Sequence, residues 1–344
     1  MSAGYNGGHK RQKEVILMAG FHDIIGHDDI IRHLKNAIGK VSHSYIFTGE
    51  AGSGKKLLAG TFAAALQCES GESEPCMTCD SCKKVIGKNH PDIITVTHEK
   101  PGSISIDEVR DQVVRDVDIK PYCSPYKIYI IPDAEMMTVQ AQNAILKTIE
   151  EPPEYAVILF LTNTLDVLLQ TVRSRCIIMN LRSVDTKMIQ QYLMQKYQLP
   201  DYQARVCAAY AQGNVGKAIM MATSEHFREM QDFLLRLLKR VDDMEVYEIV
   251  AAIHDMTAYK MDIRDLIDLM MVWYRDVLIL KATEDINQLV YQDEHKYLQK
   301  KAITSSYEGL NNIMEALEKA KIRLNANVNF DITMEMLLLT IKEN

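Results

Sequence analysis

The chain has 344 residues, of which 47% are hydrophobic and 25% are charged, a composition that is typical of folded globular proteins and excludes global disorder and fibrous repeats. At roughly 150 residues per domain, this length predicts two or three domains. The formal net charge of -7, from 39 Lys and Arg against 46 Asp and Glu, excludes binding of nucleic acid through overall basicity.

Residues 1–20 place basic side chains before a short apolar run that lacks a cleavage site of small residues, and we expect a loose extension rather than an export signal. The longest apolar runs, such as 156–161, are far shorter than the roughly 18 residues of a membrane-spanning helix. The seven cysteines are an odd number and favour a reducing compartment over a disulfide framework. We therefore expect a cytoplasmic protein without a membrane partner.

Residues 21–180 alternate short β-branched runs with helical patterns, which predicts an α/β domain: a buried parallel sheet with helices on both faces. One helix is expected at 57–66, and the expected strands are 45–48, 93–97, 127–131 and 156–162. Residues 181–222 carry short amphipathic stretches around Pro200 and a turn at 213–216, and they predict a small helical lid.

Residues 223–344 are predicted to form an all-helical domain. All nine prolines lie at or before Pro200, and Gly309 is the only glycine after Gly216. Apolar residues recur there at spacings of three and four, as in 266–273, which is typical of packed helices that bury one stripe. Asp331 is expected to cap the final helix.

A glycine-rich loop follows the first expected strand and precedes a helical pattern, in the order that a phosphate-binding P-loop requires. Glycines allow backbone N–H groups to close around a phosphate at a helix N-terminus, and a lysine adds charge for the terminal phosphates. The alternative is an ordinary glycine-rich turn. The candidate phosphate-binding residues are Gly49, Gly52, Gly54 and Lys55.

Two residues that hold Mg²⁺ in active P-loop ATPases are replaced. Lys56 stands after Lys55, where Ser or Thr would bind the metal, and its ammonium group repels a cation. Pro132 stands where a metal-linked aspartate is expected, with Asp133 in the place of a catalytic glutamate. We expect no efficient hydrolysis, and whether ATP or ADP binds without hydrolysis stays open.

Four cysteines lie in a polar insertion at 68–82, close enough to surround one tetrahedral zinc ion. Because sulfur would fill all four positions, none is left for a catalytic water, and the zinc would be structural. The alternatives are unrelated buried cysteines, a redox pair, or a freestanding nucleic-acid module, which the lack of interleaved aromatic residues disfavours. The candidate ligands are Cys68, Cys76, Cys79 and Cys82.

Five sequence motifs occur in order along the chain: FHDIIG at 21–26, HSYIFTGEAGSGK at 43–55, the cysteine quartet, AQNAILKTIEEPP at 141–153 and TVRSRC at 171–176. Together they resemble subunits of the bacterial DNA polymerase III clamp loader, a branch of the AAA+ ATPases. The resemblance is dense from residue 21 to about residue 216, whereas the C-terminal helices match only in length and helical character.

The resemblance implies a role for each matching residue. It implies that the phosphate loop and the cysteine quartet are those of an AAA+ domain with a zinc insertion. Thr162 and Asn163 match the first sensor, and Arg175 matches an arginine finger that reaches nucleotide held by a neighbouring gamma/tau subunit. Residues 223–344 match a collar. The implied partners are the gamma/tau and delta subunits and, through the complex, the sliding clamp and primer–template DNA.

The departures from the family pattern favour a non-motor subunit, or stator. Besides Lys56 and Pro132, Gly216 stands where a motor subunit has a second-sensor arginine. A degraded site beside an intact Arg175 predicts a chain without ATPase activity of its own that completes the site of its neighbour. The alternatives are an autonomous ATPase of the gamma/tau type and, for Arg175, a surface salt bridge. We interpret the run 150–153, EEPP, as a helix stop without chemistry.

Overall fold

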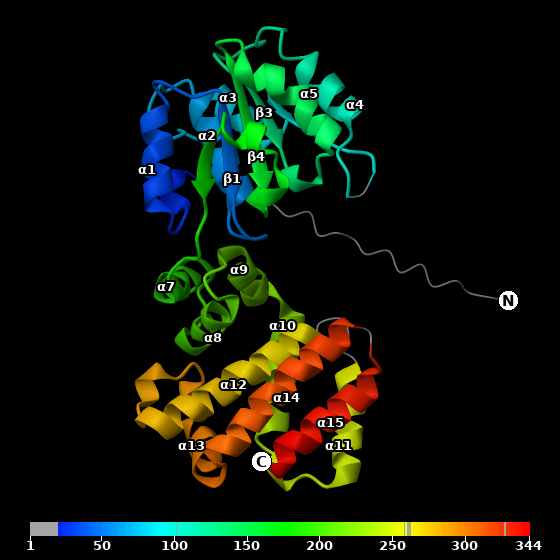
Figure 1. Ribbon diagram of the computed structural model, residues 1–344. Coiled ribbons are helices and arrows are strands. Elements are labelled where there is room, and N and C mark those ends of the chain that lie inside the picture. The colour runs from blue at the N-terminus through cyan, green and yellow to red at the C-terminus, as the bar shows by residue number, and fades with distance from the viewer. Residues whose placement is uncertain (1–19, 101, 258, 260–262, 327) are drawn as a thin grey trace, which may run out of the picture. The chain divides into compact units, whose positions relative to one another are not determined.

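A computed structural model describes residues 20–344 apart from residues 101, 258, 260–262 and 327 (Figure 1). Its chain divides into two compact units: the first ends at Ser183 and the second runs from Val184 to Asn344. The extension expected at 1–20 lies outside the described residues except for Gly20. Within the described part, no helix is both long enough and apolar enough to cross a membrane.

The first unit is built on a five-stranded parallel sheet with the strand order β2-β3-β4-β1-β5. The unexpected strand is β5, which the sequence pattern missed because it is a short edge strand in which only Met179 is buried. The structure also ends β2 at Thr95, earlier than expected. The strands are β1 (Ser44–Thr48), β2 (Ile93–Thr95), β3 (Lys127–Ile131), β4 (Ala156–Thr162) and β5 (Ile177–Asn180).

Helices cover both faces of this sheet, which confirms the predicted α/β architecture (Figure 1). Alternate residues of β4 point to opposite faces, so Val157 joins one hydrophobic core and Ile158 the other. One face is covered by α1 (Asp28–Ala37) and α2 (Lys55–Leu66), with α3 (Asp80–Ile86) beside α2. The other face is covered by α4 (Ile106–Val109), the π-helical turn Arg110–Val114, α5 (Val139–Glu150) and α6 (Gln170–Arg173).

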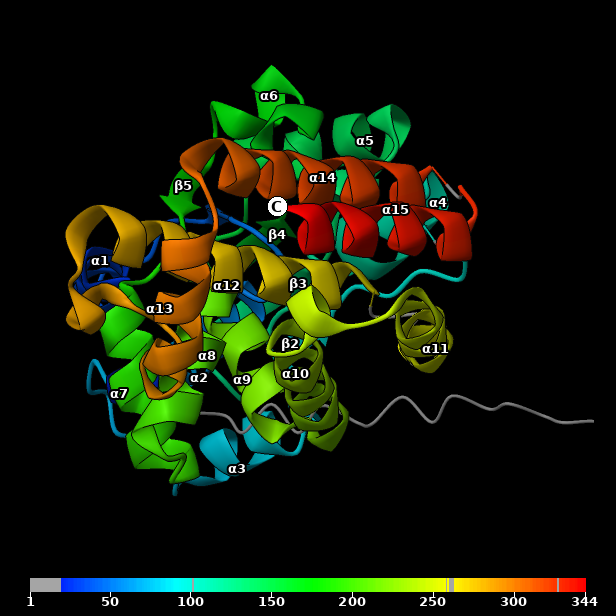
Figure 2. The same ribbon diagram turned by 90° about the horizontal axis from the view of Figure 1, so that it is seen from below.

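The second unit is helical throughout its described residues, as predicted. Its core surrounds α12, whose Leu266, Met270 and Trp273 are buried and which packs against α10, α13 and α14. Figure 2 shows α14 and α15 running side by side. The helices are α7 (Thr186–Tyr197), α8 (Asp201–Ala211), α9 (Val215–Thr223), α10 (Glu225–Leu238), α11 (Val246–Met256), α12 (Ile263–Thr283), α13 (His295–Thr304), α14 (Tyr307–Asn325) and α15 (Phe330–Glu343).

Two details of the helical region qualify the sequence predictions. The cap of α15 is Asn329, whose side chain accepts the backbone N–H of Ile332 at 3.0 Å, so the expected cap at Asp331 is wrong. Asp331 lies instead in the first turn, where its negative charge interacts favourably with the partial positive charge of the helix N-terminus. The expected lid forms α7 to α9 in the same unit as the remaining helices, and its division from a collar at residue 222 stays a prediction.

Candidate functional sites

The glycine-rich loop connects β1 to α2 at the carboxyl edge of the parallel sheet. Gly52 and Gly54 have φ angles of 85° and 98°, which residues with a Cβ atom adopt only at a cost. The Gly49 N–H donates to the Thr162 carbonyl at 3.3 Å, so the loop begins beside the end of β4. The loop thus lies at a helix N-terminus, as phosphate binding requires.

Lys55, the first residue of α2, folds back onto this loop. Its ammonium donates to the carbonyl oxygens of Gly49 at 2.5 Å and Glu50 at 2.8 Å, and to Asn163 Oδ1 at 2.9 Å. The residue is only 8% exposed, and burial lowers the pKa of its ammonium group. Because an ammonium has three N–H donors, a phosphate would have to replace at least one of these bonds.

Glu135 belongs to the same network, although sequence reasoning did not select it. The backbone N–H of Asn163 donates to Glu135 Oε2 at 3.2 Å, and the Asn163 side-chain amide donates to Oε1 at 2.5 Å. Asn163 therefore links Lys55 to an acid that follows β3. Thr162 is buried and its hydroxyl donates to the Thr164 carbonyl at 2.9 Å, outside this chain of bonds. The sequence signal that could have identified Glu135 is its position as a second acid, two residues after Asp133.

Arg175 lies between α6 and β5, at the amino ends of the strands. The glycine-rich loop lies at their carboxyl ends. Its Nη2 pairs with Glu150 Oε1 at 2.8 Å, while Nη1 donates to the Thr171 carbonyl at 2.9 Å and to the Ser174 hydroxyl at 3.3 Å. The side chain is 39% exposed. A partly exposed guanidinium, with five N–H donors, remains accessible to an anion outside the chain.

The register of the sheet fixes the separation of Arg175 from the phosphate loop. Thr48, which precedes the loop, pairs with Asn180 of β5, and Arg175 comes five residues before Asn180. Arg175 itself lies in the turn before β5, and β5 from Ile177 to Asn180, at about 3.3 Å per residue, spans about 10 Å between its amino and carboxyl ends. The phosphate loop thus lies at the carboxyl ends of the strands and Arg175 at their amino ends.

The four cysteines of the insertion come together. Their sulfur atoms all lie within 4.8 Å of one another, and four sulfurs bound to one zinc ion at 2.3 Å would be about 3.8 Å apart. The quartet joins the end of α2 to the start of α3, because Cys68 follows α2 and Cys79 is the N-cap residue of α3. The donor set fits the expected tetrahedral zinc, and these four residues could hold one ion.

Hydrogen bonds around the quartet favour thiolates. Backbone N–H groups donate to the sulfurs of Cys68 at 3.3 Å, Cys76 at 3.4 Å and Cys79 at 3.3 Å. Hydrogen bonds from Thr78 lower the pKa of the Cys76 thiol to about 6, whereas burial raises the pKa of the Cys82 thiol. Burial therefore favours the neutral thiol of Cys82 unless a cation offsets the charge of its thiolate.

His90, Asp92 and Cys123 form a second group whose ligand atoms lie within 4.8 Å of one another. The Asp92 carboxylate accepts the backbone N–H groups of Tyr122 at 2.5 Å and Cys123 at 2.9 Å. His90 Nδ1 accepts the Asp92 N–H at 3.2 Å, and Nε2 contacts the Ser81 hydroxyl at 3.1 Å. These bonds occupy both ring nitrogens and the carboxylate, so the group anchors a loop.

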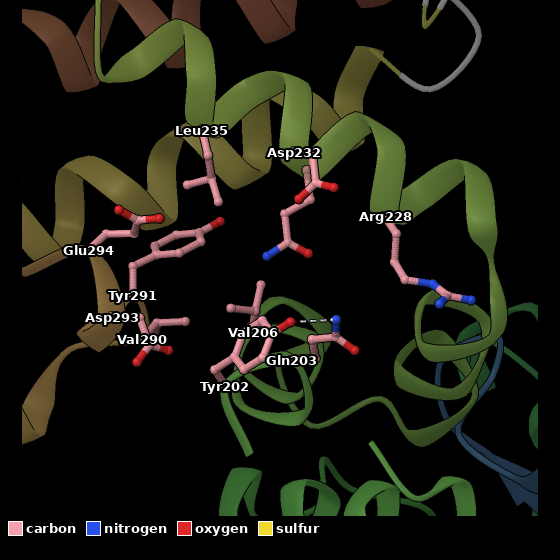
Figure 3. A pocket seen from close by; sticks show the side chains of 11 residues that line it. Tyr202, Gln203, Val206, Arg228, Asp232, Leu235, Val290, Tyr291, Asp293 and Glu294 are labelled. Atoms are coloured by element: carbon pink, nitrogen blue, oxygen red, sulfur yellow. Dashed lines mark hydrogen bonds between the residues drawn. The ribbon is translucent and has the colours of Figure 1, made fainter. Parts of the chain in front are cut away.

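The second unit contains a pocket of about 480 Å³, lined by residues of α8, α10 and segment 290–294 (Figure 3). On one wall the Gln203 amide donates to the Tyr202 hydroxyl at 2.8 Å. The charged lining consists of one guanidinium and three carboxylates, an arrangement that disfavours a phosphate group. This pocket is therefore no rival to the glycine-rich loop as a nucleotide site. The charged lining residues are Arg228, Asp232, Asp293 and Glu294.

Comparisons with known proteins agree with this architecture. Two family models match the chain: "DNA polymerase III, delta subunit" over residues 26–185 and "DNA polymerase III, delta subunit, C terminal" over residues 225–343. The chain is 29% identical over 324 residues to DNA polymerase III subunit delta' of Bacillus subtilis, covering 91% of this chain and 95% of that protein. The chain belongs to the DNA polymerase III clamp-loader family. The resemblance inferred from the motifs is thereby confirmed.

Other members of the family are similar over part of their length. The chain is 28% identical over 302 residues to subunit tau of Bacillus subtilis, covering 80% of this chain but 53% of that protein. It is 34% identical over 176 residues to subunit tau/gamma of Haemophilus influenzae, covering 50% of this chain and 25% of that protein. A solved gamma subunit-related protein of Thermotoga maritima shares 21% identity with a TM-score of 0.41, covering 91% of this chain and 98% of that one.

Proposed function

We propose that this chain is a delta-prime-type stator of the clamp loader, which supplies Arg175 in trans to a neighbouring ATPase subunit. The observation that carries the proposal is the position of Arg175 before β5, at the amino end of a strand whose carboxyl end lies level with the start of the chain's own phosphate loop. An arginine finger acts by direct contact with a transferring phosphoryl group. A residue at the other edge of the sheet is suited to a neighbour's nucleotide instead.

The chain's own phosphate loop also supports the proposal that Arg175 acts at the nucleotide of a neighbouring subunit. Lys56 offers an ammonium where Mg²⁺ needs a hydroxyl, and Pro132 offers no carboxylate at the end of β3. The Lys55 ammonium is already bonded to Gly49, Glu50 and Asn163. Without residues that hold the metal ion, ATP or ADP bound there would not be hydrolysed.

The proposed partners follow from this role. The gamma/tau subunits would hold the nucleotide that Arg175 contacts, and the delta subunit would complete the ring. The sliding clamp and primer–template DNA would be reached through the complex, since the chain itself carries a net charge of -7. We further propose one structural zinc ion and a cytoplasmic location, where reduced thiols persist.

The test is clamp- and DNA-stimulated ATP hydrolysis by a complex reconstituted with gamma/tau, delta, the clamp and primed DNA. Arg175→Ala should lower this rate steeply, because a finger contributes about a thousandfold or more at the site it serves. Arg173→Ala is the matched control, since Arg173 is two residues away but pairs with Asp166 at 3.1 Å. If Arg175→Ala hydrolyses ATP as fast as wild type, the finger assignment is wrong.

A further inference from the structure

Two carboxylates lie at the C-terminal end of α5, where they are electrostatically unfavourable. Glu150 is the last residue of α5 and Glu151 is its C-cap. The partial negative charge of a helix C-terminus disfavours acidic side chains, so a pair of them needs a reason. For Glu150 the structure provides one, because its Oε1 lies 2.8 Å from Nη2 of Arg175.

We propose that Glu150 is a positioning residue for Arg175, holding the guanidinium ready for the nucleotide of the neighbouring subunit. This inference rests on the proposed function of Arg175 as a finger in trans. Both residues precede a strand of the parallel sheet, Glu150 before β4 and Arg175 before β5, so they lie at the same edge. The pair is thus at the edge opposite the chain's own phosphate loop.

The contacts of Arg175 leave part of its guanidinium available. Glu150, Thr171 and Ser174 accept three of its N–H groups, and a guanidinium has five. The contact with Glu150 restrains a long side chain that otherwise samples many rotamers. Restraint before the nucleotide arrives lowers the entropic cost of forming the finger contact.

The expected effect of losing Glu150 is small because both side chains of the ion pair are partly exposed. The side chains of Arg175 and Glu150 are 39% and 45% exposed, and an exposed ion pair shifts an equilibrium by about two- to fivefold. Loss of Glu150 should therefore lower kcat by about two- to fivefold, far less than loss of Arg175 itself. The KM for ATP, which is set by the neighbour's own phosphate loop, should stay unchanged.

The experiment measures kcat and KM in the reconstituted complex for Glu150→Ala, Glu150→Gln, Glu151→Ala, Arg175→Ala and the double variant Glu150→Ala with Arg175→Ala. We expect Glu150→Ala to lower kcat alone and Glu150→Gln, which keeps a hydrogen-bonding group, to retain more of the rate. Glu151→Ala is the matched control and should behave as wild type. The double variant should be no slower than Arg175→Ala, because Glu150 acts only through Arg175.

Three results would overturn the inference. If Glu150→Ala is as fast as wild type or faster while Arg175→Ala is slow, Glu150 does not position Arg175, and the finger role stands. If Glu150→Ala slows the Arg175→Ala background further, Glu150 acts independently of the finger. If Arg175→Ala itself matches wild type, the proposed function fails and this inference with it. Should Glu150→Ala not assemble, Glu150→Asn, which is polar but one methylene shorter, takes its place with the same expected outcomes.

Discussion

Asp276 on α12 is a buried carboxylate that holds a loop of the second unit. It is 0% exposed, and its Oδ2 accepts the backbone N–H groups of Val290 at 2.7 Å and Tyr291 at 2.8 Å. Its Oδ1 has no hydrogen-bond partner among the described residues, although Arg275 lies 3.7 Å away. Burial raises the pKa of Asp276 from 3.8 to about 6, so the fold favours the protonated acid.

The raised pKa of Asp276 predicts a pH dependence of stability. Because the folded pKa of about 6 exceeds the unfolded value of 3.8, the native state binds the proton more tightly, and stability falls as pH rises through this window. The loss of stability caused by ionisation of buried Asp276 is complete above the folded pKa. Asp276→Asn cannot ionise, so its free energy of unfolding relative to wild type should rise by about 1 kcal/mol from pH 5 to pH 7.5. Urea unfolding at both pH values measures this, and a constant difference would contradict it.

Glu135 and Glu150 show what sequence reasoning misses at the scale of single residues. Arg175 was selected by its motif, but its partner Glu150 was interpreted as part of a helix stop, since nothing local distinguishes it from Glu151. Similarly, Glu135 reaches Asn163 only because β3 and β4 are neighbours in the sheet. A side chain's partner across the sheet is a property of strand order, which motifs do not contain.

At the scale of elements, the cysteine insertion gathers four sulfurs where it has little hydrophobic core. The segment between α2 and α3 contributes few buried apolar residues, and Cys82 is the fully buried member of the quartet. Spacing predicted that the four cysteines belong together, and the structure brings their sulfurs within 4.8 Å. Metal binding to such a site contributes directly to folding.

Zinc analysis tests this insertion. Protein purified without chelator should contain one zinc equivalent, measured by inductively coupled plasma mass spectrometry. Cys79→Ser should lose the metal and lower Tm by about 5 °C, because the insertion then has neither metal nor core. Cys123→Ser is the control, since Cys123 is exposed and contacts Asp92 through its backbone N–H. Metal-free wild-type protein, or a Cys79→Ser variant that keeps its zinc, would contradict the assignment.

At the scale of the whole molecule, the proposed function assigns the phosphate loop and Arg175 to different catalytic sites. The two lie at opposite edges of one parallel sheet. Under this proposal, a site that needs both a phosphate loop and an arginine would be completed only when two chains meet. The isolated chain lacks both the metal-binding hydroxyl after Lys55 and an acid at position 132.

This arrangement predicts the behaviour of the purified chain alone. Its steady-state ATP hydrolysis in Mg²⁺ should be indistinguishable from that of its Lys55→Ala variant, because Lys56 and Pro132 replace the hydroxyl and the carboxylate that hold Mg²⁺ in active P-loop ATPases. The same preparation should stimulate hydrolysis when added to gamma/tau, delta, clamp and primed DNA. Brisk turnover by the isolated chain that Lys55→Ala abolishes would favour an autonomous ATPase of the gamma/tau type.

The sequence by itself determined the features that depend on neighbours along the chain. The glycine loop, the cysteine spacing and the helical periodicity after residue 223 are local patterns, and each predicted its element. The tertiary structure alone decided which side chains share an edge of the sheet. The order β2-β3-β4-β1-β5 brings Glu135 to Asn163. The parallel direction of the strands places Glu150 and Arg175 together at the amino ends and Lys55 at the carboxyl ends. Residues far apart in sequence meet only through packing, because burial of apolar surface, rather than any local motif, selects the order of the strands.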